Sequence, residues 1–213
     1  MKKYLVMLVL GSLLFSTAGA YAQVLTGRQL DKAVNTAVKA KTKELKKGKW
    51  ILTGTSLPLE TALERHYKTL LGSDNEEIVA NVGMCQSLNV CSSQAQNNAL
   101  ITYASSAGSY IRGRVTSDMF NNASAKVPEE FDKFYAAYER LISQEIKGDV
   151  LLSIAFEKPH KKGGGREYQA HYIVNADKAA EKRMRAYQLA TQETNLAQQY
   201  AEKVSEFVKE GFK

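Results

Sequence analysis

Apolar residues recur at helical spacing in five segments of the chain. The clearest run follows Pro58, where apolar positions return every three or four residues until Gly72 ends the pattern. Its members are Leu59, Ala62, Leu63, Tyr67, Leu70 and Leu71. The same spacing predicts helices over residues 26–47, over 92–115 with Ser92 and Ser93 as caps, from Pro128 to Gly148, and from Asp177 to Glu210 as one long helix.

Alternation of apolar and polar residues predicts strands between these helices. It is present in residues 78–84, 150–157 and 167–174, and a short extended run covers residues 49–53. The sequence KPHKKGGG between the last two strands is typical of a hairpin loop. This order of elements predicts an α+β fold, with helices packed on a small, mainly antiparallel sheet and a long C-terminal helix.

The N-terminus has the pattern of an export signal. Lys2 and Lys3 precede an apolar run, and Ala20-Tyr21-Ala22 supplies the small residues of a cleavage site. The run is shorter than the roughly 20 residues that span a membrane. We therefore expect a signal peptide (1–22), a lysine-rich lead segment or helix (23–47) and a single α+β domain (48–213), with no transmembrane segment in the mature form.

The positive charge is confined to one part of the chain. The sequence has 29 Lys and Arg against 22 Asp and Glu, and its net charge is +7. Two of these charges belong to Lys2 and Lys3. Residues 24–50 hold 8 basic and 2 acidic groups, a net charge of +6. Residues 51–213 hold 19 basic and 20 acidic groups, a net charge of −1. Because nucleic-acid-binding folds spread basic groups over a folded face, we expect no nucleic acid as partner.

The lysine-rich segment has two interpretations. An amphipathic basic helix can lie on an anionic membrane or envelope polymer. Its apolar stripe is thin and lacks aromatic residues, however, so we favour a solvated helix or tether. The residues that could contact an anionic surface are Lys39, Lys41, Lys43, Lys46, Lys47, Lys161 and Lys162.

Several segments together resemble a known family. They are the alanine-rich helix at residues 94–100, the helix end Ile146-Lys147-Gly148, the strand at 150–154 and a return strand with Tyr168 and Tyr172. In this order they resemble the bacterial envelope proteins named after a twenty-kilodalton outer-membrane lipoprotein, and residues 50–67 look like exported Bacteroides relatives. The resemblance implies an α+β fold, residence in the envelope and no established enzymatic reaction. The chain departs from the family in lacking the lipid-bearing cysteine.

No motif for catalysis or metal binding is present. Cys85 and Cys91 could form a disulfide or remain two buried thiols, and both readings stay open. The three histidines fall on a predicted helix (His66), loop (His160) and strand (His171), and nothing in their spacing pairs them, although His171 could face His160 across the hairpin. Since G-x-S-x-G, phosphate-loop and paired-carboxylate patterns are missing, we predict no catalytic residue, no metal and no cofactor.

The sequence therefore favours an exported, non-catalytic envelope or periplasmic protein of a Gram-negative bacterium. Such a protein would act through contacts with an envelope protein or polymer, and its C-terminal helix could pair with another copy. One alternative is a small-molecule or glycan-binding module with a groove lined by Tyr103, Tyr110, Tyr168 and Tyr172. Another is an envelope-polymer hydrolase whose site is assembled from distant residues.

Overall fold

A computed structural model describes residues 25–119, 129–160, 163–196 and 198–211. The predicted signal peptide and the loop residues Lys161 and Lys162 lie outside these ranges. The elements are α1 (Gly27–Gly48), β1 (Ile51–Thr53), α2 (Leu59–Leu71), β2 (Asn75–Cys85), α3 (Leu88–Arg114), the π-helical turn η1 (Val115–Met119), α4 (Glu129–Glu145), β3 (Leu151–Pro159), β4 (Arg166–Asn175), α5 (Ala176–Thr194) and α6 (Gln198–Glu210). They confirm the predicted α+β class.

The four strands form one sheet in the order β1-β3-β4-β2, with every neighbouring pair antiparallel. The β3–β4 hairpin and the long β2 make up most of the sheet, while β1 pairs only with residues 155–157. His171 of β4 lies opposite Ile154 of β3, and Pro159 pairs with Arg166 at the far end of the hairpin. His171 therefore does not face His160 across the hairpin.

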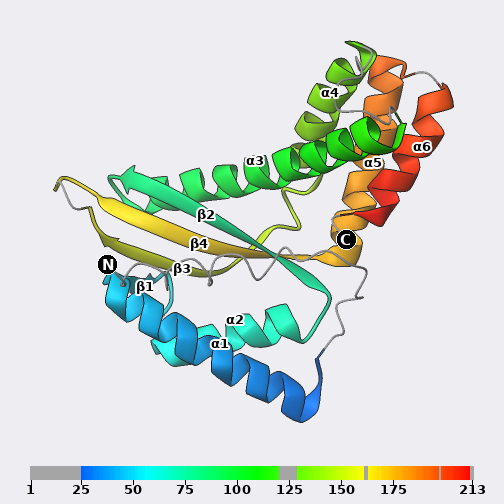
Figure 1. Cartoon of the computed structure of the whole chain (residues 1–213). Helices are drawn as coiled ribbons and strands as arrows, with labels where there is room; N and C mark the ends of the chain where they lie inside the picture. The colour runs from blue at the N-terminus through cyan, green and yellow to red at the C-terminus, as the bar shows by residue number, and fades with distance from the viewer. Residues whose placement is uncertain (1–24, 120–128, 161–162, 197, 212–213) are drawn as a thin grey trace, which may run out of the picture.

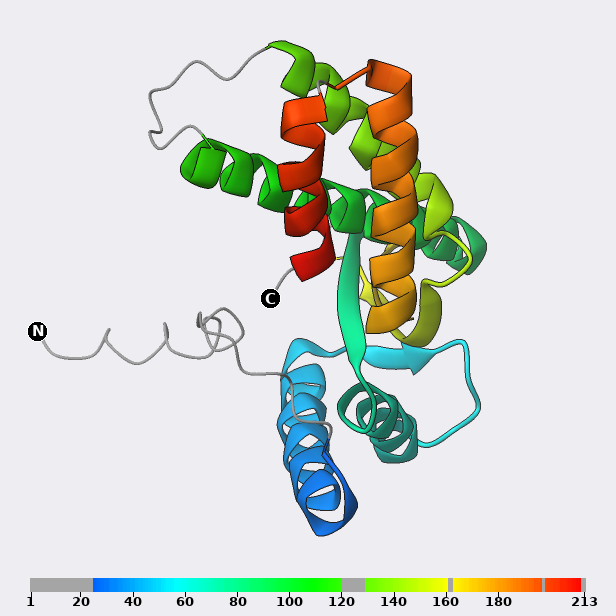
Figure 2. The same ribbon diagram turned by 90° about the vertical axis from the view of Figure 1, so that its right-hand side faces the viewer.

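Helices cover both faces of the sheet (Figure 1). Helices α1 and α2 lie on one face, and α3 crosses the other and continues past the end of the sheet. There it meets α4, α5 and α6, which stand together as a helical bundle (Figures 1 and 2). The aromatic stripe of α4 forms the centre of this bundle, and its members are almost completely buried: Phe131, Phe134, Tyr135 and Tyr138.

Helix α1 belongs to the packed fold. Leu45 is fully buried and Val34 nearly so, and Leu45 shares a core with Leu63 of α2 and with Phe156 of β3. The preference for a solvated helix or tether is thus wrong. The thin apolar stripe of α1 is enough to hold the helix in the fold, because it packs on α2 and the sheet face, which supply the larger side chains.

The predicted long C-terminal helix is two helices. Asn195 adopts a left-handed conformation with φ 52°, which asparagine tolerates better than most residues, and the chain turns back between α5 and α6. The apolar residues of α6 are buried inside this chain: Val204, Phe207 and Val208. Helix α3 also starts earlier than predicted, since Ser87 accepts a hydrogen bond from the backbone N–H of Val90 and caps it.

Candidate metal centre

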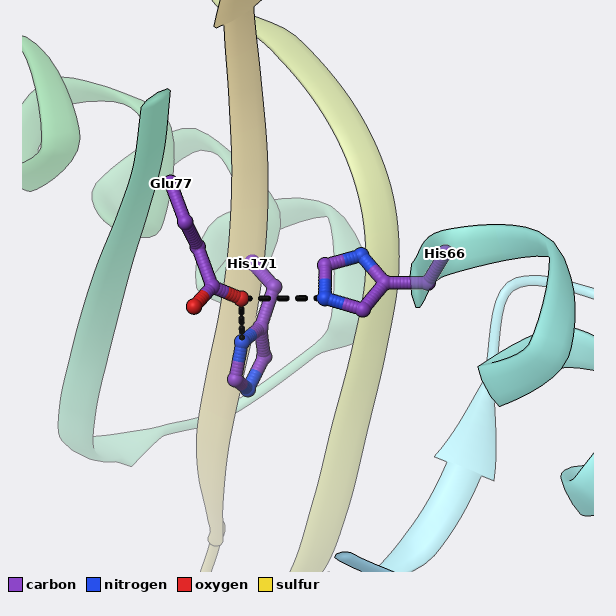
Figure 3. A group of neighbouring side chains, drawn as sticks. All are labelled: His66, Glu77 and His171. Carbon is purple, nitrogen blue, oxygen red and sulfur yellow. Dashed lines mark hydrogen bonds and ion pairs between the residues drawn. The ribbon is translucent and has the colours of Figure 1, made fainter. Parts of the chain in front are cut away.

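Three side chains from three elements converge where α2 meets the sheet (Figure 3). They are His66 of α2, Glu77 of β2 and His171 of β4, and one ligand atom from each lies within 4.8 Å of the others. Glu77 Oε1 is the shared point: it lies 2.7 Å from His171 Nδ1 and 3.0 Å from His66 Nε2.

Local structure explains why these side chains meet. The buried residues of α2 are Ala62, Leu63 and His66, which helical spacing places on one face toward the sheet. In the β2–β4 pair, Glu77 lies opposite Ile173 and Val79 opposite His171. Glu77 and His171 are therefore diagonal neighbours on the same face, within reach of each other's long side chains.

The second nitrogen of each imidazole also has an oxygen partner. Ser153 Oγ lies 2.8 Å from His66 Nδ1, and Gln169 Oε1 lies 3.3 Å from His171 Nε2. The amide of Gln169 is oriented in turn by Asn81, because its Nε2 donates to Asn81 Oδ1 at 2.8 Å. Such oxygen partners are typical of metal-binding histidines, whose ring orientation and tautomer they set.

A β-bulge places Ser153 at the site. Leu152 pairs with Tyr172 and Ile154 with His171, so Ser153 is an extra residue on β3 between two successive pairs. A bulge reverses the alternation of side chains locally. As a result Ser153 and Ile154 can both be directed to the face that carries His171.

The site is enclosed on the α2 side and more open at the carboxylate. His66 and His171 are 2% and 5% exposed, whereas the Glu77 side chain is 26% exposed. Burial alone raises the pKa of the Glu77 carboxyl, but its close contacts with the imidazoles of His171 and His66 outweigh burial and lower this pKa to about 2. Glu77 is therefore ionised at neutral pH.

The hydrogen bonds of the site do not satisfy all three groups. The Glu77 and Gln169 oxygens can only accept, so a neutral His171 ring, with one N–H, can donate to only one of them; when it donates to Gln169, the Nδ1 lone pair faces the Glu77 carboxylate. Two acceptors at 2.7 Å need a proton or a metal ion between them. His66 Nε2 is buried and forms no hydrogen bond within the described ranges, although Glu77 Oε1 lies at an ion-pair distance of 3.0 Å from it.

The donor set fits a borderline divalent ion. Two imidazole nitrogens and one carboxylate oxygen are ligands of Zn²⁺ and of several other transition metals. At metal–ligand distances of about 2.0–2.1 Å, donors of a tetrahedral ion lie about 3.3 Å apart. To admit the ion, Glu77 Oε1 would move back from the two rings by a few tenths of an ångström, and the two ring nitrogens, which lie within 4.8 Å of each other, would settle at the same separation of about 3.3 Å.

The two cysteines form a disulfide away from this site. Cys85 ends β2 and Cys91 lies in the first turn of α3, with Cα atoms 5.3 Å apart. Both are buried. The structure thus decides for the disulfide over two free thiols, and it leaves no cysteine thiolate for the metal site.

The tyrosines proposed for a ligand groove do not form an exposed surface. Tyr103, Tyr168 and Tyr172 are at most 4% exposed and belong to the core, and Tyr110 is partly buried against it. A shallow hollow of about 660 Å³ lies between α3 and α4, but it is lined by small hydroxyl side chains, Arg112 and Glu139 and not by these tyrosines. The prediction of a ligand-binding groove lined by these tyrosines is therefore wrong.

A second buried ionic group has a structural role. Arg183 of α5 is 5% exposed; it donates to the hydroxyl of Tyr103 on α3 and lies 3.5 Å from Glu76 Oε1 on β2. Burial raises the pKa of Glu76, and the positive charge of Arg183 opposes this effect. The group connects the end of the sheet to the helical bundle.

The class defined by fold and site is thus an α+β protein with a two-histidine, one-carboxylate cluster between a helix and a sheet face. Comparison with protein-family models, curated proteins and solved structures found no match to this chain. In the parts of the chain that the structure describes, no helix is sufficiently long and apolar to cross a bilayer.

Proposed function

We propose that this protein binds one divalent transition-metal ion, Zn²⁺ in the first instance, through His66, Glu77 and His171, and that it does so in the bacterial envelope. The observation that carries the proposal is the buried Nε2 of His66, which lacks a hydrogen-bond partner among the described residues beside an ionised carboxylate. A cation at this point gives every group a partner.

The envelope location rests on separate support. The N-terminal pattern of an export signal and the resemblance to the twenty-kilodalton lipoprotein-like family both favour it, and the Cys85–Cys91 disulfide suits an oxidising compartment. Bacterial envelope proteins meet metal ions there without the thiol buffers of the cytosol.

Three protein ligands leave a coordination position for a further donor. Structural zinc sites have four protein ligands, whereas sites with three keep a water molecule or an external ligand in the fourth position. The partly exposed Glu77 marks the open side. We therefore assign the fourth position to solvent or to a donor from a binding partner. This is consistent with a protein that acts through contacts with an envelope protein or polymer.

The test is zinc titration of the exported chain after removal of metal with a chelator. We expect one ion per chain by calorimetry, and a Co²⁺ complex with the visible absorption of a tetrahedral site. His66→Ala, Glu77→Ala and His171→Ala should each abolish the tight site. His160→Ala is the matched control, because it removes a histidine that lies outside the cluster, and it should bind as the unaltered chain does.

Two results would contradict the metal proposal. One is equal binding by His66→Ala and the unaltered chain, and the other is equal loss in His160→Ala and His171→Ala. Binding should also stabilise the fold, by about 2.7 kcal/mol when free zinc is 100 times Kd. This stabilisation should be missing in His171→Ala and present in His160→Ala.

One contact favours a second candidate function, hydrolysis by a serine nucleophile. Ser153 is exposed and its Oγ lies 2.8 Å from His66 Nδ1, while Glu77 contacts the other nitrogen of the same ring. A serine, a histidine and an acid in this sequence of contacts can perform acyl transfer. Covalent labelling of Ser153 by a fluorophosphonate in the metal-free chain, lost in Ser153→Ala, would favour this function over metal binding.

A further inference from the structure

The basic residues of α1 form a straight stripe on its outer side. Arg28, Lys32, Lys39, Lys43 and Lys46 are separated by 4, 7, 4 and 3 positions. At 3.6 residues per turn these spacings keep all five within about 60° of arc, and they extend over about 27 Å of helix. The five are exposed.

The stripe faces away from the packed side of α1. The two buried residues of the helix, Val34 and Leu45, lie about 140° around the helix from the middle of the stripe. Figures 1 and 2 show α1 as an outer helix, on the side of the sheet opposite α3 and remote from the α4–α6 bundle. The packing that buries Leu45 therefore also fixes the direction in which the charges point.

Few acidic groups neutralise the stripe. Lys46 lies 3.4 Å from Glu60 of α2, in a pair whose side chains are both more than half exposed. The other four stripe residues form no ion pair with any residue that the structure describes. Lys41 is different: it is 13% exposed, pairs with Glu44 at 2.8 Å and points off the stripe.

A hollow beside the stripe has room for an anionic group. Its volume is about 420 Å³, and it is lined by Val38, Thr42 and Glu60 together with Lys39, Lys43 and Lys46. A phosphate held there would meet the ammonium groups of these three lysines and would compete with the Glu60 carboxylate for Lys46. The apolar surface of Val38 suits the glycerol end of a lipid headgroup.

We propose that α1 docks this protein on an anionic lipid bilayer, with the stripe lying along the surface and a headgroup phosphate in the hollow. A straight row of cations on a protruding helix fits a flat surface, whereas a flexible polymer would gain more from a concave groove. The uneven distribution of charge also orients the molecule on the bilayer, because residues 24–50 carry a net charge of +6 and residues 51–213 a net charge of −1. The proposal is independent of the metal centre.

Vesicle flotation tests it, using the exported chain with phosphatidylcholine vesicles that contain or lack phosphatidylglycerol. We expect binding only to the anionic vesicles, and weaker binding as salt rises. Each basic residue near such a surface contributes roughly a fivefold gain in partitioning. The triple variant Lys32→Gln, Lys39→Gln, Lys43→Gln should therefore bind on the order of 100-fold more weakly.

The matched control removes the same charge elsewhere. Lys133, Lys147 and Lys209 are exposed and lie on or beside the helices of the other end of the molecule. The triple glutamine variant at these positions should bind nearly as the unaltered chain does. Equal loss in the two variants, or equal binding to neutral vesicles, overturns the proposal. So does binding to soluble polyphosphate without flotation, which would indicate a polymer partner instead.

Discussion

The imidazole rings of His66 and His171 lie edge to face with centroids 5.6 Å apart, across the interface between α2 and the sheet. Both rings reach the same oxygen of Glu77. Their other nitrogens reach Ser153 and Gln169, so five polar side chains are linked in one cluster at the edge of an apolar core.

Removing the hydroxyl of Ser153 should weaken metal binding without unfolding the chain. The hydroxyl holds His66 Nδ1 at 2.8 Å and so sets the orientation of the ring. Loss of such a partner typically reduces metal affinity 10–100-fold. We expect this reduction for Ser153→Ala in a zinc titration, and no change for the exposed control Ser106→Ala. An unchanged affinity in Ser153→Ala would show that the bulge has no part in the site.

Truncation of Leu45 should destabilise the whole fold. The side chain is fully buried among α2 and β3 residues, and Leu→Ala changes at such positions cost about 2–5 kcal/mol. Leu151→Ala is the matched control, because Leu151 is 64% exposed and its loss should cost less than about 0.5 kcal/mol. Urea denaturation of both variants measures the difference. Equal stabilities would mean that α1 does not contribute to folding.

Opening the disulfide should lower stability while leaving the metal centre unchanged. A short loop closed by a disulfide is expected to stabilise by about 2 kcal/mol. For a chain of this size the corresponding loss in Tm is about 4–8 °C. We expect this shift for the double variant Cys85→Ala, Cys91→Ala in a thermal melt. Its zinc stoichiometry should stay the same, since Glu77 lies in the first part of β2 and Cys85 at its end.

Stability should fall at alkaline pH because of buried tyrosines. Burial raises the pKa of Tyr135 and of Tyr172 to about 12, from an ordinary value near 10. Between these values the unfolded chain has lost protons that the folded chain keeps. The stability that the neutral hydroxyls contribute is therefore complete below pH 10 and is lost as pH rises through 12.

Near-ultraviolet absorbance of tyrosinate and denaturant midpoints, measured on either side of pH 10, provide the check. Tyr172→Phe should reduce the pH dependence without loss of stability at neutral pH, because the Tyr172 hydroxyl makes no hydrogen bond to the described part of the chain. A titration in which all tyrosines ionise near 10 while the chain stays folded would contradict the burial.

Local patterns predicted most elements of this fold. The limits of α2 lie close to those that the sequence predicts, because Pro58 and Gly72 bound a strongly periodic run. Strands β2, β3 and β4 appear where alternation placed them. The break at Asn195 was missed since apolar spacing continues through it, and only the packing of α6 back on the chain selects the turn.

The site could be predicted only in part. His66 falls within the apolar run of a predicted helix and His171 on a predicted strand, whereas Glu77 directly precedes the predicted strand at 78–84 and joins it only in the structure. Their proximity depends on how β2 pairs with β4 and on which face α2 covers. The bulge at Ser153, which has no sequence signal of its own, completes the arrangement.

The sequence by itself determined most of the helices and strands, the α+β class and the concentration of charge in residues 24–50, because each follows from neighbouring residues along the chain. The tertiary structure decided that α1 is packed, that the tyrosines are core, that the cysteines are joined and that His66 and His171 share Glu77. These contacts depend on strand register and helix docking, which bring together residues that are far apart in the sequence and that no local pattern connects.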